Sequence, residues 1–151
     1  MLNPADLLLY LCTDFSLSLG RPLNEAVEAA IAGGITLVQV REKTASSRDF
    51  YRLALQAEAE GADYLGVGAV YPTGSKTDAG EAIGIEGLAK IRAAVRLPLV
   101  AIGGIHAGNA LQIMDAGASG IALISGILSQ VDIEAATRNI RRMLESRRRK
   151  G

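Results

Sequence analysis

The sequence predicts an α/β fold of five parallel β/α units in one domain covering residues 1–151. Short apolar runs, suited to buried strands, alternate five times with segments whose apolar residues recur at helical spacing. Each unit takes about thirty residues, and the loops inside the units are short. Such units join parallel strands through right-handed crossovers, so we expect one parallel sheet covered by helices.

Five apolar or β-branched runs give the expected strands, at residues 7–12, 36–40, 64–70, 97–102 and 120–124. The first helix is expected after Pro22, which suits a first turn, and should end at Gly33 and Gly34. Further helices are expected at about 47–60, around 88–95, over 107–116, and along a stripe of apolar residues from Ile133 to Leu144.

Composition narrows the possible functions. Hydrophobic residues make up 49% and charged residues 21%, as in ordinary globular chains. Sixteen basic residues balance sixteen acidic ones, so we expect neither a nucleic-acid nor an acidic-membrane partner. The sequence contains no leader pattern and no long apolar span, and its single Cys12 lies in an apolar run. These features predict a cytoplasmic protein with Cys12 buried as a small hydrophobe.

The carboxyl end of the third expected strand is the first candidate site. Thr73, Ser75 and Lys76 supply two hydroxyl groups and a cation there, and Gly74 lets backbone amides approach a ligand. This is the chemistry that a phosphate needs, although an ordinary surface turn has the same composition.

Other strands contribute groups to the same side, because the carboxyl ends of parallel strands lie together. After the second strand, Gln39, Arg41 and Lys43 alternate along the chain and so share one face. Gly103 and Gly104 follow the fourth strand and could free helix amides for a phosphate. The fifth strand ends in Ile124, Ser125 and Gly126. Two cations together with these backbone amides could hold a diphosphate and a monophosphate side by side.

Three structural alternatives accompany this interpretation. Arg41 and Lys43 could form ion pairs with neighbouring carboxylates, although a surface pair contributes only about 0–1 kcal/mol. His106 is interpreted as a helix-start or solvent-facing residue in preference to a general base. Asp14 is interpreted as a turn cap in preference to a metal ligand.

Four segments together resemble the thiamine phosphate synthase family. They are Gln39-Val40-Arg41-Glu42-Lys43, the run from Gly66 to Lys76, Ala101-Ile102-Gly103-Gly104-Ile105, and Leu123-Ile124-Ser125. The family is a (β/α)8 barrel that joins hydroxymethylpyrimidine diphosphate to thiazole phosphate with loss of pyrophosphate, using Mg2+. The resemblance therefore implies a transferase of thiamine biosynthesis whose partners are small-molecule phosphates.

The resemblance also implies residue roles. Gln39, Arg41, Lys43 and Lys76 would hold the pyrimidine diphosphate, and Thr73, Ser75, Gly104, Ile124 and Ser125 would hold the thiazole phosphate. Compared with the family, about three β/α units are missing, with a junction near 55–59. The missing part includes the family's Mg2+-binding segment, so no residue here is assigned to the metal and we expect impaired catalysis. The alternative is a non-catalytic phosphate-binding or fold-variant protein derived by internal deletion.

The shortened barrel has an architectural consequence. If family contacts persist, the strand order would be 2-1-5-4-3, a piece of TIM-barrel wall with the second and third strands at its edges. Open edges pair readily, so we expect a homodimer or higher homo-oligomer. A rearranged, doubly wound five-stranded sheet is the alternative.

Overall fold

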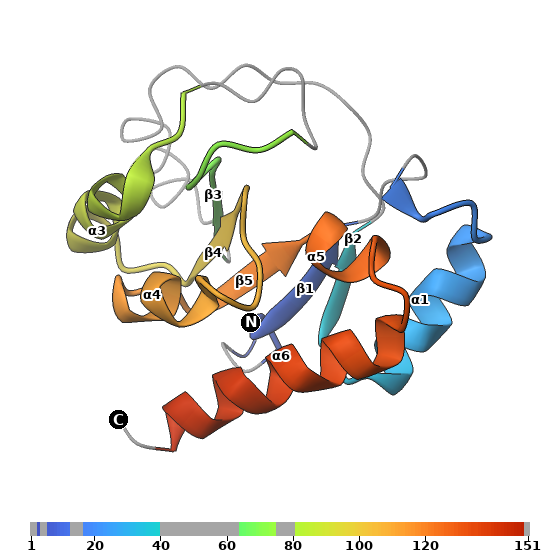
Figure 1. Ribbon diagram of the computed structural model, residues 1–151. Helices are drawn as coiled ribbons and strands as arrows, with labels where there is room; N and C mark the ends of the chain where they lie inside the picture. The colour runs from blue at the N-terminus through green and yellow to red at the C-terminus, as the bar shows by residue number, and fades with distance from the viewer. Residues whose placement is uncertain (1–2, 4–5, 13–16, 40–63, 75–80, 150–151) are drawn as a thin grey trace.

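The computed structural model describes residues 3, 6–12, 17–39, 64–74 and 81–149. These residues form a five-stranded parallel sheet in the order β2-β1-β5-β4-β3 (Figure 1). The strands are β1 (Leu9–Cys12), β2 (Leu37–Gln39), β3 (Leu65–Val67), β4 (Leu99–Ile102) and β5 (Gly120–Leu123). The predicted α/β class with a parallel sheet is thus confirmed, and the strand order matches the one that the resemblance implied.

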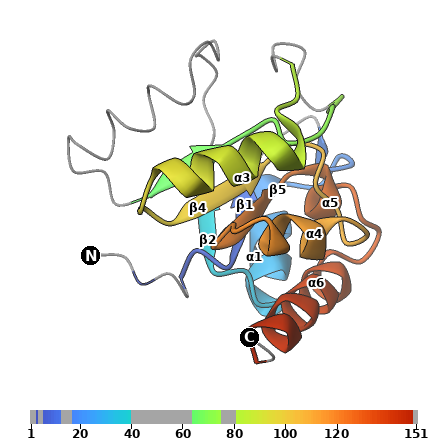
Figure 2. The ribbon, with the colours of Figure 1, turned by 90° about the vertical axis from the view of Figure 1, so that its left-hand side faces the viewer.

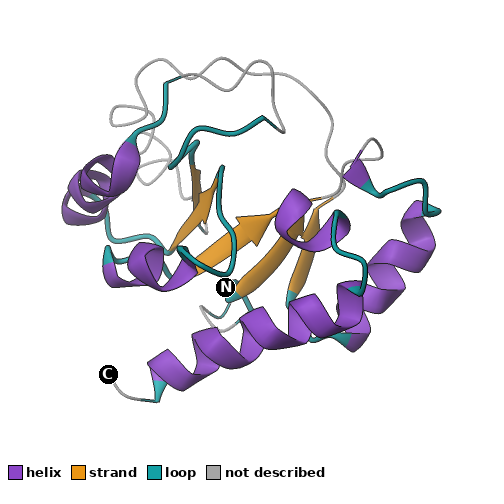
Figure 3. Cartoon of the chain, in the orientation of Figure 1, coloured by secondary structure: helices purple, strands orange, loops and turns teal. Residues whose placement is uncertain are grey.

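The helices follow one another around one side of the curved sheet (Figures 1 and 2). Their bounds are α1 (Leu23–Ala32), α3 (Gly84–Ala94), α4 (Ala110–Asp115), α5 (Ser125–Leu128) and α6 (Ile133–Arg148). The short α5 lies at the carboxyl end of β5, directly before the long α6 (Figure 3). The other helices pack against the strands and against one another, α1 on α6 in particular.

Alternate residues of each central strand face opposite sides, as a pleated strand requires. One set packs with helix residues in the main core; it comprises Leu9, Leu11, Leu99, Ala101, Ile121 and Leu123. The other set, Tyr10, Val100 and Ala122, forms a smaller cluster with Leu7 on the opposite face. Because both faces are buried, the strands carry continuous apolar runs instead of an alternating pattern.

The close packing of α1 on α6 depends on Gly33, at the end of α1. A Cβ atom on Gly33 would lie 2.6 Å from the Glu134 carbonyl oxygen and 2.6 Å from Thr137 Cβ. The fully buried Thr137 hydroxyl donates to the Ile133 carbonyl at 2.7 Å, so its polar group is satisfied inside the core. Asp132 begins α6 as an N-cap, accepting from Ala135 N at 2.9 Å.

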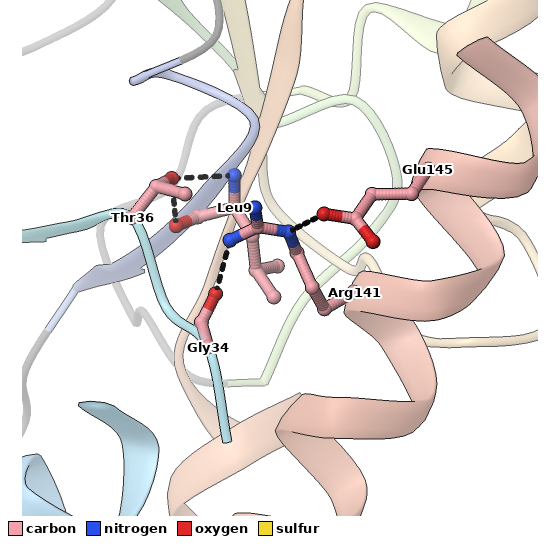
Figure 4. A network of polar contacts seen from close by, with 5 residues as sticks. All are labelled: Leu9, Gly34, Thr36, Arg141 and Glu145. Carbon is pink, nitrogen blue, oxygen red and sulfur yellow. Dashed lines mark hydrogen bonds and ion pairs between the residues drawn. The ribbon is translucent and has the colours of Figure 1, made fainter. Parts of the chain in front are cut away.

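Side chains tie the backbone together where β1 and β2 begin, in a set of contacts that we name the amino-end network (Figure 4). The Thr36 hydroxyl accepts from Leu9 N at 2.9 Å and donates to Leu9 O at 2.7 Å. Arg141 Nη1 donates to the Gly34 carbonyl at 2.7 Å, and its Nε donates to Glu145 Oε1 at 2.6 Å. The network links β1, the start of β2 and α6.

Some sequence-based boundaries were wrong. The helix expected over 107–116 begins only at Ala110, because His106 N donates to Asn109 Oδ1 at 2.9 Å and forms a turn first. The one-turn helix α5 was not predicted. The strands expected over 64–70 and 97–102 are shorter, covering Leu65–Val67 and Leu99–Ile102. The helix expected at 47–60 lies outside the described residues.

Candidate functional site

The loops that follow β3 and β4 run side by side beyond the ends of these strands. Val70 N donates to Ile102 O at 3.0 Å, and Tyr71 N donates to Gly103 O at 3.1 Å. These bonds continue the pairing of β3 with β4 into the loops. They therefore fix the chain that leads to Thr73 against the glycine pair after β4.

The backbone conformation of Gly104 and its close contacts require a glycine. Gly104 has φ +64°, in the left-handed region that side chains other than glycine rarely adopt. A Cβ atom there would lie 2.7 Å from Tyr71 Cβ and 2.8 Å from the Pro72 carbonyl oxygen. Thr73 follows Pro72 directly, so Gly104 and Thr73 belong to adjoining stretches of backbone.

The turn after β5 adjoins the same region. Ile124 is 8% exposed and precedes α5, whose first residue Ser125 is exposed. A Cβ atom on Gly126 would lie 3.2 Å from the carbonyl oxygen of Ile105, the residue after Gly104. The β5–α5 turn and the loop after β4 are therefore in direct contact.

The structure thus brings together Gly104, Ile124 and Ser125, with Thr73 on the next loop along the sheet. The amide groups at the start of a helix have no acceptor within the helix, and glycine loops leave room for a ligand to reach backbone amides. Such a group of loops can bind a phosphate chiefly through backbone N–H groups. Ser75 lies outside the described residues.

The residues expected to hold a diphosphate are mostly outside the described part. Arg41, Lys43 and Lys76 are not described, and only the backbone position of Gln39 is known. Gln39 ends β2 and pairs with Cys12 of β1. It is therefore three strand spacings from β4, or about 14 Å along the sheet. This separation suits two ligands lying side by side.

His106 has a local partner, as the helix-start interpretation expects. Its side chain is exposed, and its Nδ1 accepts from Gly108 N at 3.1 Å. The side chain of Asn109 completes the turn by donating to the Gly104 carbonyl at 2.9 Å. Cys12 is buried, as predicted, and Asp14 lies outside the described residues.

Two side chains that fix loops or helices around the site were not predicted from the sequence. The Tyr71 hydroxyl donates to Gln112 Oε1 at 3.1 Å, which ties the loop after β3 to α4. Arg21 donates to backbone carbonyls just beyond α5. A partner that is a carbonyl group leaves no signal in the sequence, because every residue carries one.

On the other face of the sheet, Tyr10 is buried and interacts with Tyr64. Burial, together with a hydrogen bond to Tyr64, raises the pKa of Tyr10 above its usual range. Tyr10 therefore stays protonated at neutral pH and offers neither an anion nor a base to a ligand.

A hollow of about 370 Å³ lies between the starts of α1 and α6, away from the predicted site residues. Its charged lining consists of Arg21 together with Glu25, Asp132 and Glu134. Three carboxylates against one cation would repel a phosphate, so this hollow is not the anion site.

The described residues contain neither a cluster of metal-binding side chains nor a membrane-spanning helix. Within them, no group of three or more His, Cys, Asp and Glu side chains is placed to hold a metal ion. The same part of the chain contains no helix long and apolar enough to cross a membrane.

The chain matches a known family model, described as thiamine monophosphate synthase, over two segments, residues 9–59 and 52–127. Among curated relatives, the thiamine-phosphate synthase of Ruminiclostridium cellulolyticum is 37% identical over 203 residues, covering 93% of this chain and 96% of the relative. The corresponding protein of Moorella thermoacetica is 34% identical over 205 residues, covering 94% of this chain and 98% of its own length.

Solved structures give a matching result. The thiamine phosphate pyrophosphorylase from Pyrococcus furiosus superimposes with a TM-score of 0.79 at 31% sequence identity. The superposition covers 95% of this chain and 98% of the archaeal one. Likeness in sequence and likeness in fold therefore point to the same group of proteins.

Proposed function

Because the chain belongs to the thiamine monophosphate synthase family, we propose that it binds thiazole phosphate at the carboxyl ends of β3, β4 and β5. The reaction that we assign to this site is the coupling of hydroxymethylpyrimidine diphosphate to thiazole phosphate, with release of pyrophosphate. This is a transferase step of thiamine biosynthesis.

One observation carries the proposal, namely the contact between the Gly104 loop and the Ile124–Ser125 turn. In the proposed complex, the backbone of these two segments holds the phosphate and Thr73 adds a hydroxyl group from the neighbouring loop. The Gly104 conformation supports this role, because a glycine with positive φ at the carboxyl end of a strand lets a ligand approach the backbone closely.

The second substrate is assigned to the β2 side of the sheet. Gln39 at the end of β2, with Arg41 and Lys43 shortly after it in the sequence, would bind the diphosphate there. Lys76, which follows β3 in the sequence, would contribute from the other edge strand. Cations placed there would stabilise the charge that develops as the diphosphate leaves the pyrimidine.

We propose that the chain is a TIM-barrel relative with an internal deletion of about three β/α units near residues 55–59. Two facts support this. The two segments matched by the family model meet at residues 52–59, and the alignments with relatives extend over 203 and 205 residues, more than the 151 residues of this chain. The helices of the described residues lie on one side of the curved sheet, which also favours a piece of barrel wall over a doubly wound sheet with helices on both faces.

The deletion bears on Mg2+, which the family uses. The described residues offer no group of carboxylates that fits a metal ion, so no residue is assigned to Mg2+ and no step is derived through it. This favours a second candidate function, a phosphate-binding protein whose catalysis is impaired or absent. We also propose a homodimer or higher homo-oligomer, because β2 and β3 are the edge strands of the described sheet.

Turnover and binding measurements test the proposal together. The purified chain is incubated with both substrates and Mg2+, and formation of thiamine phosphate is followed. Thiazole phosphate binding is measured separately by calorimetry. Turnover would establish the enzyme, whereas binding without turnover would establish the second candidate. Absence of both would remove the proposed function.

A pair of serine variants sharpens the binding test. In the proposed complex the Ser125 hydroxyl also donates to the phosphate. Ser125→Ala should therefore weaken thiazole phosphate binding by about 10- to 150-fold, because a hydrogen bond to a charged group contributes about 1.5–3 kcal/mol. Ser146→Ala is the matched control, since its hydroxyl is exposed on α6 and donates only to Met143 O at 2.8 Å. Equal affinity of the two variants would exclude the Ser125 side chain from the site.

A further inference from the structure

Arg21, in the loop between β1 and α1, lies against the far end of α5. Its Nη1 is 3.5 Å from the Leu128 carbonyl oxygen and 3.1 Å from that of Gln130, and its Nη2 is 2.8 Å from that of Val131. A single guanidinium group thus binds three backbone carbonyls, one at the end of α5 and two in the connection to α6. Among the described residues Arg21 has no ion pair, although Glu25 and Asp132 line the hollow beside it.

The helix that Arg21 supports cannot be stable by itself. α5 has four residues, about one turn, and helices of that length do not form without tertiary contacts. Its apolar side is fixed by Ile127 and Leu128, both fully buried. The Ser125 and Ile127 carbonyls accept from the amides of Ser129 and Gln130, and Arg21 approaches the last carbonyl, that of Leu128, where a cation complements the helix dipole.

Two further contacts connect the residues after α5 to the β1–α1 loop and to the start of α5. Ser129 Oγ donates to the Leu17 carbonyl at 3.0 Å, which gives a second link between the β1–α1 loop and the end of α5. Gln130 Nε2 lies 3.4 Å from the carbonyl oxygen of Ser125, which connects the end of the turn to its beginning. The carbonyls that Arg21 binds and Ser125 are therefore separated by a single helical turn.

We propose that Arg21 is a positioning residue for the phosphate site: it sets the orientation of the Ile124–Ser125 turn by holding the opposite end of α5. This inference rests on the proposed function, because that function places the phosphate at this turn. Arg21 itself touches no substrate in the proposal. Its effect depends on the flat guanidinium group, which can reach several carbonyls at once, whereas a lysine would provide a single point of attachment.

The chain offers a matched control in Arg141. This residue also uses its guanidinium to bind a distant backbone carbonyl, that of Gly34 at 2.7 Å, but at the opposite end of the sheet. Arg21→Ala and Arg141→Ala remove the same type of side chain and the same type of contact. Only the first change should affect the phosphate site.

The test compares wild type, Arg21→Ala, Arg21→Lys and Arg141→Ala at a temperature where all are folded. Amide hydrogen exchange is followed at Ile127 and Leu128, whose N–H groups donate to the Ile124 carbonyl, and affinity for thiazole phosphate is measured by calorimetry. In Arg21→Ala we expect exchange at these amides to rise by about tenfold or more, and affinity to fall by a similar factor. Arg21→Lys should lie between wild type and alanine, and Arg141→Ala should change neither quantity.

Each other outcome has a defined meaning. Unchanged exchange in α5, or faster exchange with unchanged affinity, would overturn the positioning role. If Arg21→Ala does not fold, Arg21→Lys decides by the same two measurements. If the wild-type protein does not bind thiazole phosphate, the proposed function fails on its own, and the exchange data then decide whether Arg21 holds α5.

Discussion

The two ends of the sheet are built in different ways. At the amino ends of β1 and β2, the Thr36 and Arg141 side chains bind the backbone at 2.7–2.9 Å. At the carboxyl ends of β4 and β5, by contrast, backbone packs directly on backbone, with Gly104 in a conformation that a larger residue would strain. Side-chain bonds fasten one end, whereas glycines allow the loops of the other end to pack closely on one another. The first arrangement provides stability, and the second lies where we propose the phosphate site.

The largest expected effect comes from a change at the carboxyl end. Gly104→Ala would place a Cβ atom 2.7 Å from Tyr71 Cβ in a left-handed conformation. We expect a loss of about 2–4 kcal/mol in unfolding free energy, from backbone strain and overpacking together, and loss of thiazole phosphate binding. Urea unfolding and calorimetry measure the two effects. Normal binding in a stable variant would contradict the proposed role of this loop.

A change at the amino end should separate stability from binding. Arg141→Ala removes the bond to the Gly34 carbonyl, and we expect unfolding free energy to fall by about 1–3 kcal/mol. The pair with Glu145 adds less than about 1 kcal/mol, since the two side chains are 30% and 39% exposed. Thiazole phosphate affinity should stay unchanged. A large loss of affinity would show that the two ends of the sheet are coupled.

A smaller effect is expected at Thr36. Thr36→Val keeps the shape of the side chain but removes both hydroxyl bonds to Leu9, and should lower unfolding free energy by about 1–2 kcal/mol. Thr36→Ser is the control, because it retains the hydroxyl group. Similar melting curves for the valine and serine variants would mean that the amino-end network depends little on these bonds.

The smallest effect at neutral pH concerns Tyr10. Because its pKa is raised in the folded state, folding favours the protonated phenol, and stability should fall as the pH rises above about 10. Tyr10→Phe should be close to wild type at pH 7 and should lose part of this alkaline decrease. Urea unfolding at pH 8, 9.5 and 10.5 gives the comparison. Identical slopes in both proteins would assign the decrease to other groups.

Local signals in the sequence predicted much of the fold. Pro22 and the Gly33-Gly34 pair bracket α1 correctly, since proline suits a first turn and glycine ends a helix. The one-turn α5 was missed because four residues, Ser125 to Leu128, are too few to show a helical repeat of apolar residues. The start of α4 was misplaced because residues 107–109 form a turn before the helix, in which the Asn109 side chain bonds to His106 N and to the Gly104 carbonyl.

The site was predictable to a different extent. The glycine pair and the Ile124–Ser125 segment were identified from their position at the carboxyl ends of expected strands, and the family resemblance implied their role. The structure brings the two segments into contact. The contribution of Arg21 could not be inferred, because its three partners are backbone carbonyls more than a hundred residues away along the chain. The sequence gives the side chain of Arg21 but does not indicate which distant carbonyls it will meet. That contact depends on how the α5–α6 connection packs against the β1–α1 loop.

The position of β1 in the middle of the sheet constrains how the protein can fold. Its Leu9 pairs with Ile121 of β5, so β1 gains one of its two neighbours only after the residues between these strands have been synthesised. Contacts between such distant segments are slow to form, because a long loop must close before they can stabilise the fold. We therefore expect the central sheet to assemble late in folding, once β5 is available to pair with β1.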